Sequence, residues 1–254
     1  MRIDREIAYK LAPIVEENEA KKVFFGDAND ADYALLSLGH GDERYENERY
    51  QSLVDTYHLL RGNIYGAHGY LGHSEVIDGR EYDEDDARSS HYLVLKRQLV
   101  GALAIGSMRI IEKKDGNPLP VEQYFKTAFP EPAQDGAYEA SRLISVETDM
   151  RQQLRITSEL FRIGWARLLQ TKPEGTESTV YGVIGEDLEA ALTPSRLGVR
   201  TIRLADPAPV PYGTDDLPVR IDGTVLEEIH GVEALRTENV AVGAVRSWVK
   251  RSDK

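Results

Sequence analysis

Two strand patterns separated by one long helix pattern lie between residues 138 and 185. The strands are predicted at Tyr138–Val146 and Thr179–Gly185, and the helix at Leu154–Gln170, where apolar residues three and four positions apart form one stripe. A strand, a helix and a second strand in this order typically form a right-handed parallel crossover. This unit therefore predicts a mixed α/β sheet.

The rest of the chain adds strands and helices around this unit. His91–Arg97 and Leu99–Ile111 are predicted to be the two strands of a hairpin. Further helices are predicted at residues 1–22, 47–66, 121–129, 186–192, 224–236 and 238–250, further strands at 199–204 and 219–221, and a loop with one small element at 26–48. The order of elements is that of an α/β fold.

The charge balance and the absence of cysteine exclude several kinds of chemistry. The 254 residues carry 31 basic and 43 acidic side chains, and the net charge of −12 is unfavourable for binding nucleic-acid phosphates. Without cysteine there are no disulfides, thiolate metal ligands or cysteine nucleophiles. No apolar run approaches the roughly 20 residues of a membrane-spanning helix, and the first ten residues lack a signal-peptide core. We expect a cytoplasmic protein with no nucleic-acid partner and no integral membrane segment.

Sequence motifs of several enzyme classes are absent. The chain has no phosphate-binding G-x-x-x-x-G-K-[ST], no G-x-S-x-G, no H-E-x-x-H and no strand-linked G-x-G-x-x-G. Its six histidines show no zinc-ligand spacing, and the acidic run at residues 75–86 lacks the spacing of a calcium-binding loop. We expect no metal site.

Glu139 and Arg142, in the strand Tyr138–Val146, are the first candidate site residues. Side chains three positions apart on a strand point to opposite faces, so the two share a site only if the strand bulges or the arginine folds round an edge. The alternative is a half-buried ion pair or a charge at the end of the strand.

Other charged residues lie before this strand. Arg61 and Tyr65 are one turn apart on the helix predicted at 47–66, and Arg109 lies near the end of the second hairpin strand. In the acidic run, Asp83 and Asp86 either bind a substrate amine or hydroxyl or belong to a solvated loop. The alternative for each of these residues is that it lies on the protein surface and takes no part in a site.

Residues 151–172 carry four more basic than acidic side chains, in a chain of negative net charge. The segment begins a helix soon after a strand, where free backbone N–H groups favour anions. Arg151, Arg155 and Arg162 therefore either bind an anionic or acidic donor or belong to an ordinary solvent-exposed face.

Five short motifs follow one another in a fixed order. They are L-R-x-x-I-Y at Leu60–Tyr65, E-Y-D-x-x-D at Glu81–Asp86, H-Y-L-V at His91–Val94, G-S-M-R at Gly106–Arg109 and E-A-S-R-L at Glu139–Leu143. Their order and spacing resemble the acyl-homoserine-lactone (autoinducer) synthases and the related N-acyl amino acid synthases, which belong to the GNAT acyltransferase superfamily. The resemblance covers roughly residues 50–220.

The resemblance implies a three-layer GNAT-like α/β fold. A mixed, mostly antiparallel central sheet would be flanked by helices. Residues 1–45 would form an N-terminal extension with an extra helical segment, and residues 46–254 the acyltransferase domain, with a single domain overall.

The resemblance also implies roles for individual residues. It gives catalytic roles to Glu139, Arg142 and Arg109, and substrate-binding roles to Arg61, Tyr65, Asp83, Asp86 and Ser141. Glu139 would remove a proton from an amine, directly or through a water. Backbone N–H groups at a strand bulge would stabilise the oxyanion, and Arg109 or Arg142 would bind the carboxylate of the acceptor.

Two departures from the family pattern concern the substrates. The homoserine-lactone synthases have a tryptophan ten residues after the helix arginine, where this chain has Leu71, and this disfavours S-adenosylmethionine as acceptor. The helix start at residues 149–158 has no glycine, so the usual pyrophosphate-cradling loop is missing, and this favours a carrier-protein thioester over acyl-CoA. Arg151, Arg155 and Arg162 would then offer a docking face for an acidic acyl carrier protein.

We therefore expect an N-acyltransferase that moves a fatty acyl group from a thioester, acyl carrier protein or acyl-CoA, to the amine of an amino-acid-like small molecule. No permanently bound cofactor is expected. Two alternatives remain open. One is an acyl-homoserine-lactone synthase that uses S-adenosylmethionine, and the other is a non-catalytic GNAT-like domain that binds a ligand.

Overall fold

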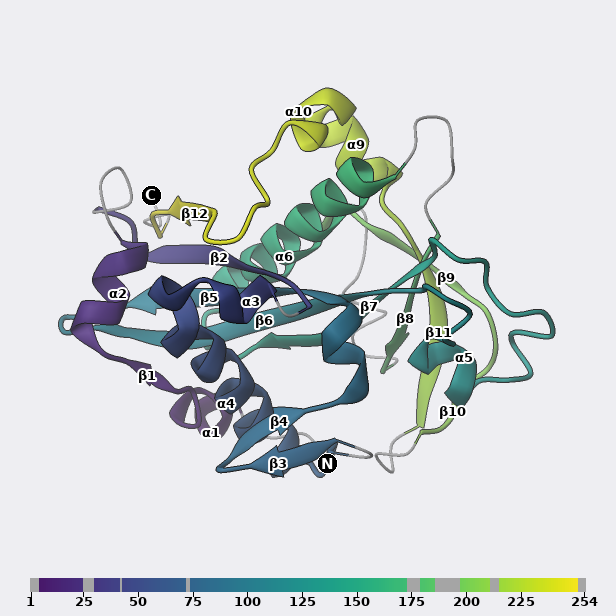
Figure 1. Cartoon of the computed structure of the whole chain (residues 1–254), viewed down its shortest axis with the longest axis horizontal. Coiled ribbons are helices and arrows are strands. Elements are labelled where there is room, and N and C mark those ends of the chain that lie inside the picture. Colours follow the sequence, from purple (N-terminus) through teal and green to yellow (C-terminus); the bar gives the residue numbers. More distant parts are fainter. Residues whose placement is uncertain are drawn as a thin grey trace. The chain divides into compact units, whose positions relative to one another are not determined.

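The computed structural model describes residues 5–24, 30–41, 43–71, 74–172, 179–185, 197–210 and 215–250. It is a mixed α/β fold with a largely antiparallel central sheet flanked by helices (Figure 1), which confirms the predicted fold class. The chain divides into two compact units. Unit 1 comprises Met1–Met108, Arg142–Thr157 and Ala241–Lys254, and unit 2 comprises Arg109–Ser141 and Ser158–Val240.

Unit 1 is built on a sheet that pairs distant parts of the chain. Its strands lie in the order β6 (Ala102–Glu112, up to Met108 in this unit), β5 (Ser89–Arg97), β2 (Tyr33–His40) and β12 (Val245–Trp248). A short strand, β1 (Ile14–Val15), pairs with β6. Residues 26–48, predicted as a loop with one small element, thus contain a strand, β2, that is buried along nearly its whole length. The division into a 1–45 extension and a 46–254 domain stays a prediction.

The helices that lie wholly in unit 1 are short apart from α4. They are α1 (Arg5–Lys10), α2 (Glu17–Val23), α3 (Glu43–Glu46), η2 (Glu48–Tyr50), α4 (Gln51–His68) and η3 (Glu84–Arg88), and the hairpin β3 (Glu75–Ile77) and β4 (Arg80–Tyr82) lies beside α4 (Figure 1). The single helix predicted at residues 1–22 is wrong, because Pro13 interrupts it and β1 follows. The helix predicted at 47–66 is confirmed as α4.

Unit 2 contains the predicted parallel pair of strands. Its strands lie in the order β10 (Ala208–Pro209), β11 (Asp215–Asp222), β8 (Val180–Ile184) and β7 (Tyr138–Ser145, up to Ser141 in this unit), and β9 (Arg200–Arg203) pairs with β11. β7 and β8 pair in parallel at Tyr138–Ala140, as predicted, whereas β11 pairs antiparallel with β8. The helix predicted at 186–192 lies outside the described residues.

Helices of unit 2 include α5 (Pro120–Tyr124) and the part of α6 (Met150–Thr171) that follows Thr157. The helix predicted at 224–236 is split at Gly231 into α9 (Thr224–His230) and α10 (Val232–Arg236). An apolar core joins α5 to the neighbouring strands and loops: Ile111, Leu119, Val121, Phe125, Ala137 and Val210.

The C-terminal segment of unit 1 differs from the prediction. A helix was expected at 238–250, but Val245–Trp248 forms the edge strand β12, which pairs antiparallel with β2. The ring of Trp248 stacks on Tyr33 with centroids 5.6 Å apart. Pairing with β2 therefore overrides the local helix pattern.

Candidate functional site

A buried ion cluster in unit 1 forms around the guanidinium of Arg61, which projects from α4. Its Nε atom donates to Glu81 Oε2 at 2.5 Å, and its Nη1 atom donates to Asp86 Oδ1 at 2.6 Å. Its Nη2 atom lies 3.7 Å from Asp83 Oδ2. The Arg61 side chain is fully buried, so these carboxylates compensate for the water it has lost.

Arg142 on β7 binds to the same carboxylates. Its Nη2 atom lies 2.7 Å from Glu81 Oε1 and 3.1 Å from Asp83 Oδ2, and it donates to Ser74 Oγ at 3.0 Å. Its guanidinium lies over the ring of Tyr65, 5.0 Å from the centroid. The structure thus brings together five of the predicted site residues: Arg61, Tyr65, Asp83, Asp86 and Arg142.

The hairpin that carries Glu81 packs closely against α4. Asp78 and Gly79 both have positive φ and form the tight turn between β3 and β4. The carbonyl oxygen of Gly79 then approaches Gly62 of α4 so closely that a Cβ atom at residue 62 would lie 1.9 Å from it. The absence of a side chain at Gly62 therefore allows β4 to bring Glu81 to Arg61.

Asp83 and Asp86 form a capping box at the start of η3. Asp83 Oδ1 accepts from the backbone N–H of Asp85 at 3.0 Å, and Asp86 Oδ2 accepts from the N–H of Asp83 at 3.1 Å. The D-x-x-D spacing thus fixes both carboxylates locally, and each has a second oxygen for an arginine.

The five charged side chains of the cluster, three carboxylates and two guanidiniums, carry a net charge of −1. Burial alone would raise the pKa of Glu81, but Arg61, Arg142 and the hydrogen bonds lower it, so this carboxylate is ionised at neutral pH. The side chains of Asp83 and Arg142 are 11% and 10% exposed, and those of the other three at most 4%. Asp83 and Arg142 are therefore the members of the cluster that are most exposed to solvent.

Arg142 has a left-handed backbone conformation, with φ of 54°, inside strand β7. A residue other than glycine rarely adopts this conformation in a strand, and it marks a bulge. The Arg142 carbonyl accepts from Ser107 Oγ at 3.3 Å. β7 is therefore irregular at Arg142.

The other predicted catalytic residues lie in unit 2. The buried carboxylate of Glu139 accepts from the backbone N–H of Val121, at the start of α5, at 2.8 Å. Arg109 on β6 is also buried and donates to Ser141 Oγ at 3.3 Å. Glu139 is thus a fixed carboxylate, while Arg109 and Ser141 form a second polar pair.

The three predicted donor-binding arginines have different surroundings. Arg151 is exposed at the start of α6, and Arg155 donates to the carbonyl of Val249 at 3.3 Å and lies over the Trp248 ring. Arg162, in unit 2, is buried and ion-paired with Glu159 and Glu238. Arg151 and Arg155 are accessible to a partner, whereas the guanidinium of Arg162 is already held by two carboxylates.

Two carboxylates accept from backbone N–H groups in the first turn of α6 and in the two residues before it. Glu147 Oε1 accepts from the N–H groups of Thr148 and Asp149, at 2.9 and 3.3 Å. Asp149 Oδ1 accepts from Arg151 and Gln152, at 3.0 and 3.3 Å. The N-terminus of α6 thus places carboxylates where a phosphate-binding helix would have free N–H groups.

Sequence reasoning missed Glu81 as a site residue, although it lies in the E-Y-D-x-x-D motif. Residues two apart on a strand share a face, so Glu81 was predictable from its position before Asp83. Ser74 donates to Glu81 Oε1 at 2.5 Å, and no sequence pattern indicates that it belongs to the site. A further buried group behind the cluster, Arg44, Tyr57, His58 and His91, was not predicted either.

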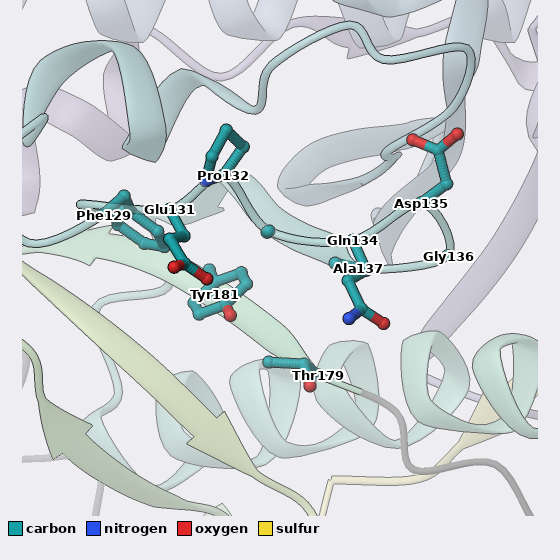
Figure 2. Close-up of a pocket in the computed structure, with 10 residues that line it drawn as sticks. Phe129, Glu131, Pro132, Gln134, Asp135, Gly136, Ala137, Thr179 and Tyr181 are labelled. Carbon is teal, nitrogen blue, oxygen red and sulfur yellow. The ribbon is translucent and has the colours of Figure 1, made fainter.

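A shallow pocket of about 380 Å³ lies in unit 2 between the loop 129–137 and the start of β8. Figure 2 shows Glu131, Gln134 and Thr179 around it, with the ring of Phe129 beside Tyr181. Their ring centroids are 5.1 Å apart. None of the predicted site residues lines this pocket.

Two kinds of feature are absent from the described part of the chain. There, no three His, Asp or Glu side chains are grouped as metal ligands. Over the same residues, no helix has the length and apolar character needed to cross a membrane.

Comparison with known proteins gives matches among solved structures only. No protein-family model matches the chain, and no curated protein does. The AHL synthase LasI is 21% identical, with a TM-score of 0.54, over 75% of this chain and 90% of LasI. The chain has the fold of an acyl-homoserine lactone synthase.

Two further solved structures show the same likeness. The CoA-dependent acyl-homoserine lactone synthase BjaI, with MTA, is 16% identical with a TM-score of 0.54, over 82% of this chain and 92% of BjaI. The CoA-dependent synthase MesI is 18% identical with a TM-score of 0.52, over 76% and 90%. These likenesses confirm the GNAT-like fold that the five motifs predict.

Proposed function

We propose that the chain is an N-acyltransferase that moves a fatty acyl group from a thioester to the amine of an amino-acid-like acceptor. The buried ion cluster carries this proposal. Its net charge of −1 suits a protonated amine, which Asp83 would bind, while the Arg142 guanidinium suits the carboxylate of the same acceptor. The likeness to synthases that make acyl-homoserine lactones supports the same class of reaction.

In the proposed reaction the Glu139 carboxylate takes a proton from the acceptor ammonium, directly or through a water. The free amine attacks the thioester carbonyl carbon, so that an N–C bond forms and the carbonyl oxygen becomes negative. The carbonyl then re-forms as the C–S bond breaks, and the leaving thiolate takes up the second proton, which the attacking nitrogen loses, so that a neutral amide and a thiol result. Glu139 returns its proton to water. Backbone N–H groups at the Arg142 bulge are the proposed donors to the oxyanion.

The roles of Glu139 as base and of Arg142 as partner of the acceptor carboxylate follow the resemblance carried by the E-A-S-R-L motif. Arg109 and Ser141 are the further polar groups proposed to orient the substrate.

For the donor, we propose a thioester carried by an acyl carrier protein. Asp149 binds N–H groups of the first turn of α6 that would otherwise face the pyrophosphate of CoA, and the negative charges of Asp149 and Glu147 would repel it. Burial would raise the pKa of Glu147, but Lys96 at 2.8 Å and the hydrogen bonds lower it, so this carboxylate is charged. Arg151 and Arg155 would bind the acidic surface of the carrier protein.

The deciding experiment is a product assay. Purified protein is incubated with acyl carrier protein and CoA thioesters, pooled amino acids and S-adenosylmethionine, and the products are identified by mass spectrometry. An N-acyl amino acid supports the proposal and identifies both substrates. Folded protein that releases no thiol from any donor contradicts it.

The main alternative is an acyl-homoserine lactone synthase, which the named activity of the three similar structures favours. This reading requires S-adenosylmethionine and releases methylthioadenosine together with the lactone. The same mass spectrometry therefore distinguishes the two enzymes. Leu71, where that family has tryptophan, favours the amino acid acceptor.

A non-catalytic ligand-binding domain is distinguished by Glu139→Gln. In an enzyme this change removes the base and lowers turnover by roughly 10²–10⁴-fold. Acceptor affinity, measured by calorimetry, should persist in either case, because Glu139 is not part of the ion cluster. Turnover equal to that of the wild type would exclude Glu139 as the base.

A further inference from the structure

A buried chain of hydrogen bonds lies behind the ion cluster in unit 1. Nη1 of Arg44 on α3 lies 2.8 Å from Nε2 of His91 on β5. Nδ1 of His91 lies 3.0 Å from the hydroxyl oxygen of Tyr57 on α4, and the same oxygen accepts from Nη1 of Arg61 at 3.2 Å. The chain of bonds connects Arg44, which the proposed reaction does not use, with the centre of the cluster.

Nε2 of His91 has both a donor, Nη1 of Arg44, and an acceptor, the Asp86 carbonyl oxygen at 3.0 Å, beside it. In either tautomer of the ring, Nδ1 binds the Tyr57 hydroxyl, and the Tyr57 oxygen accepts from Arg61. Burial and the nearby guanidiniums hold the pKa of His91 well below its usual value, although Asp86 raises it, so the ring is neutral.

Arg44 also holds the backbone that carries Asp86. Its Nη1 atom donates to the Asp86 carbonyl at 2.7 Å and to the Gly41 carbonyl at 3.1 Å. The carboxylate of Asp86 binds Arg61 at 2.6 Å. Arg61 is therefore held along two routes that begin at Arg44, one through His91 and Tyr57 and the other through Asp86.

We propose that Arg44 and His91 are positioning residues that fix the orientation of the Arg61 guanidinium. The fixed guanidinium in turn holds the carboxylates that Arg142 shares, and so keeps Asp83 and Arg142 in place for the acceptor. This inference rests on the proposed function, because it assigns the cluster to acceptor binding. It predicts that loss of the network weakens acceptor binding and leaves donor binding unchanged.

The test compares steady-state kinetics of full-length variants. Tyr57→Phe removes the shared oxygen and should raise the KM for the acceptor roughly tenfold, the effect of losing a hydrogen bond to a charged group, with the KM for the thioester unchanged. His91→Leu should act in the same way. His91→Asn, whose amide can still donate towards Tyr57, should restore part of the loss. Tyr92→Phe, at the neighbouring buried tyrosine of β5, is the matched control and should keep the wild-type KM.

Two outcomes overturn the inference. One is an unchanged acceptor KM in folded Tyr57→Phe and His91→Leu, and the other is an equal rise in the donor KM. Should these variants not fold, ¹⁵N NMR of the wild-type protein decides, since the His91 ring must be neutral at pH 6.5, where an ordinary histidine is half protonated, and its Nδ1 atom must be hydrogen-bonded to Tyr57. A charged His91 ring at that pH, or an Nδ1 atom without a hydrogen bond, contradicts the network. Wild-type protein that is inactive on every substrate contradicts the proposed function instead and leaves the NMR test intact.

Discussion

Arg142 and Glu81 meet at 2.7 Å, between Nη2 of the guanidinium and Oε1 of the carboxylate. The other carboxylate oxygen of Glu81 binds Nε of Arg61 at 2.5 Å. One buried carboxylate thus joins two guanidiniums, one from helix α4 and one from strand β7. Glu81 is therefore the residue on which the assembly of the cluster depends most directly.

Replacing Glu81 by glutamine should destabilise the protein strongly. The change leaves two buried guanidiniums short of one negative charge, and breaking such a buried pair costs about 3–5 kcal/mol. Denaturant unfolding of Glu81→Gln measures the loss. Glu75→Gln, an exposed position on the same hairpin, is the control and should change stability by less than about 0.5 kcal/mol. Equal stability of the two variants would show that Glu81 does not hold the cluster together.

The close contact between α4 and the β3–β4 hairpin gives a second prediction. A methyl group at residue 62 would meet the Gly79 carbonyl oxygen, whereas one at residue 66 would meet only the Leu71 side chain at 3.9 Å. We expect Gly62→Ala to destabilise the protein by about 1–3 kcal/mol. Gly66→Ala on the same helix should be neutral or stabilising by up to about 1 kcal/mol. Thermal unfolding of both variants tests this, and the opposite order would contradict the packing of the hairpin.

The sequence predicts well those parts of the molecule that depend on local patterns. The strand at 138–146, the helix at 47–66 and the hairpin around residue 100 are confirmed because their apolar periodicity agrees with their packing. β2 and β12 were missed because their strand character comes from pairing with strands distant in the sequence, β2 with β5 and β12 with β2, the latter across more than two hundred residues. Such long-range pairing has no local signal.

In the candidate site, too, the features that lie within short segments were predictable, and the contacts between distant parts of the chain were not. The D-x-x-D capping box and the one-turn spacing of Arg61 and Tyr65 could be recognised within short segments. The meeting of Arg142 with Glu81 depends on a bulge in β7 and on close packing at Gly62, and neither follows from a short motif. The motifs therefore predicted most members of the cluster without predicting which residue joins them.

Stability should fall in mild acid because of His58. Burial and the nearby Arg61 lower the pKa of His58 to about 4, below the usual value of 6.5. The unfolded chain binds this proton more tightly, so stability is complete above pH 6.5 and decreases as the pH falls to about 4, by about 3 kcal/mol. Denaturant unfolding at pH 7.5 and 4.5 should show a smaller loss in His58→Asn than in the wild type. The exposed control His230→Asn should keep the wild-type loss, and an unchanged loss in His58→Asn would contradict the prediction.

The proposed carrier-protein donor predicts a specific effect of charge reversal at the start of α6. Arg151 is exposed and Arg155 is partly exposed, so replacing both by glutamate should repel an acidic partner without disturbing the ion cluster. We expect the KM for the acyl carrier protein thioester to rise by roughly tenfold or more at low salt, and less at high salt because the ions screen the repulsion.

The control for this experiment is Arg200→Glu, which reverses an exposed charge on β9 and should leave the KM unchanged. Arg155 also binds the Val249 carbonyl, so circular dichroism of the double variant must first show that it is folded. The KM for the amine acceptor and the turnover at saturating donor should stay at wild-type values, because neither arginine belongs to the cluster. A carrier-protein KM that does not change would mean that the donor binds elsewhere, and efficient use of acyl-CoA by the wild type would show that Glu147 and Asp149 do not exclude a pyrophosphate.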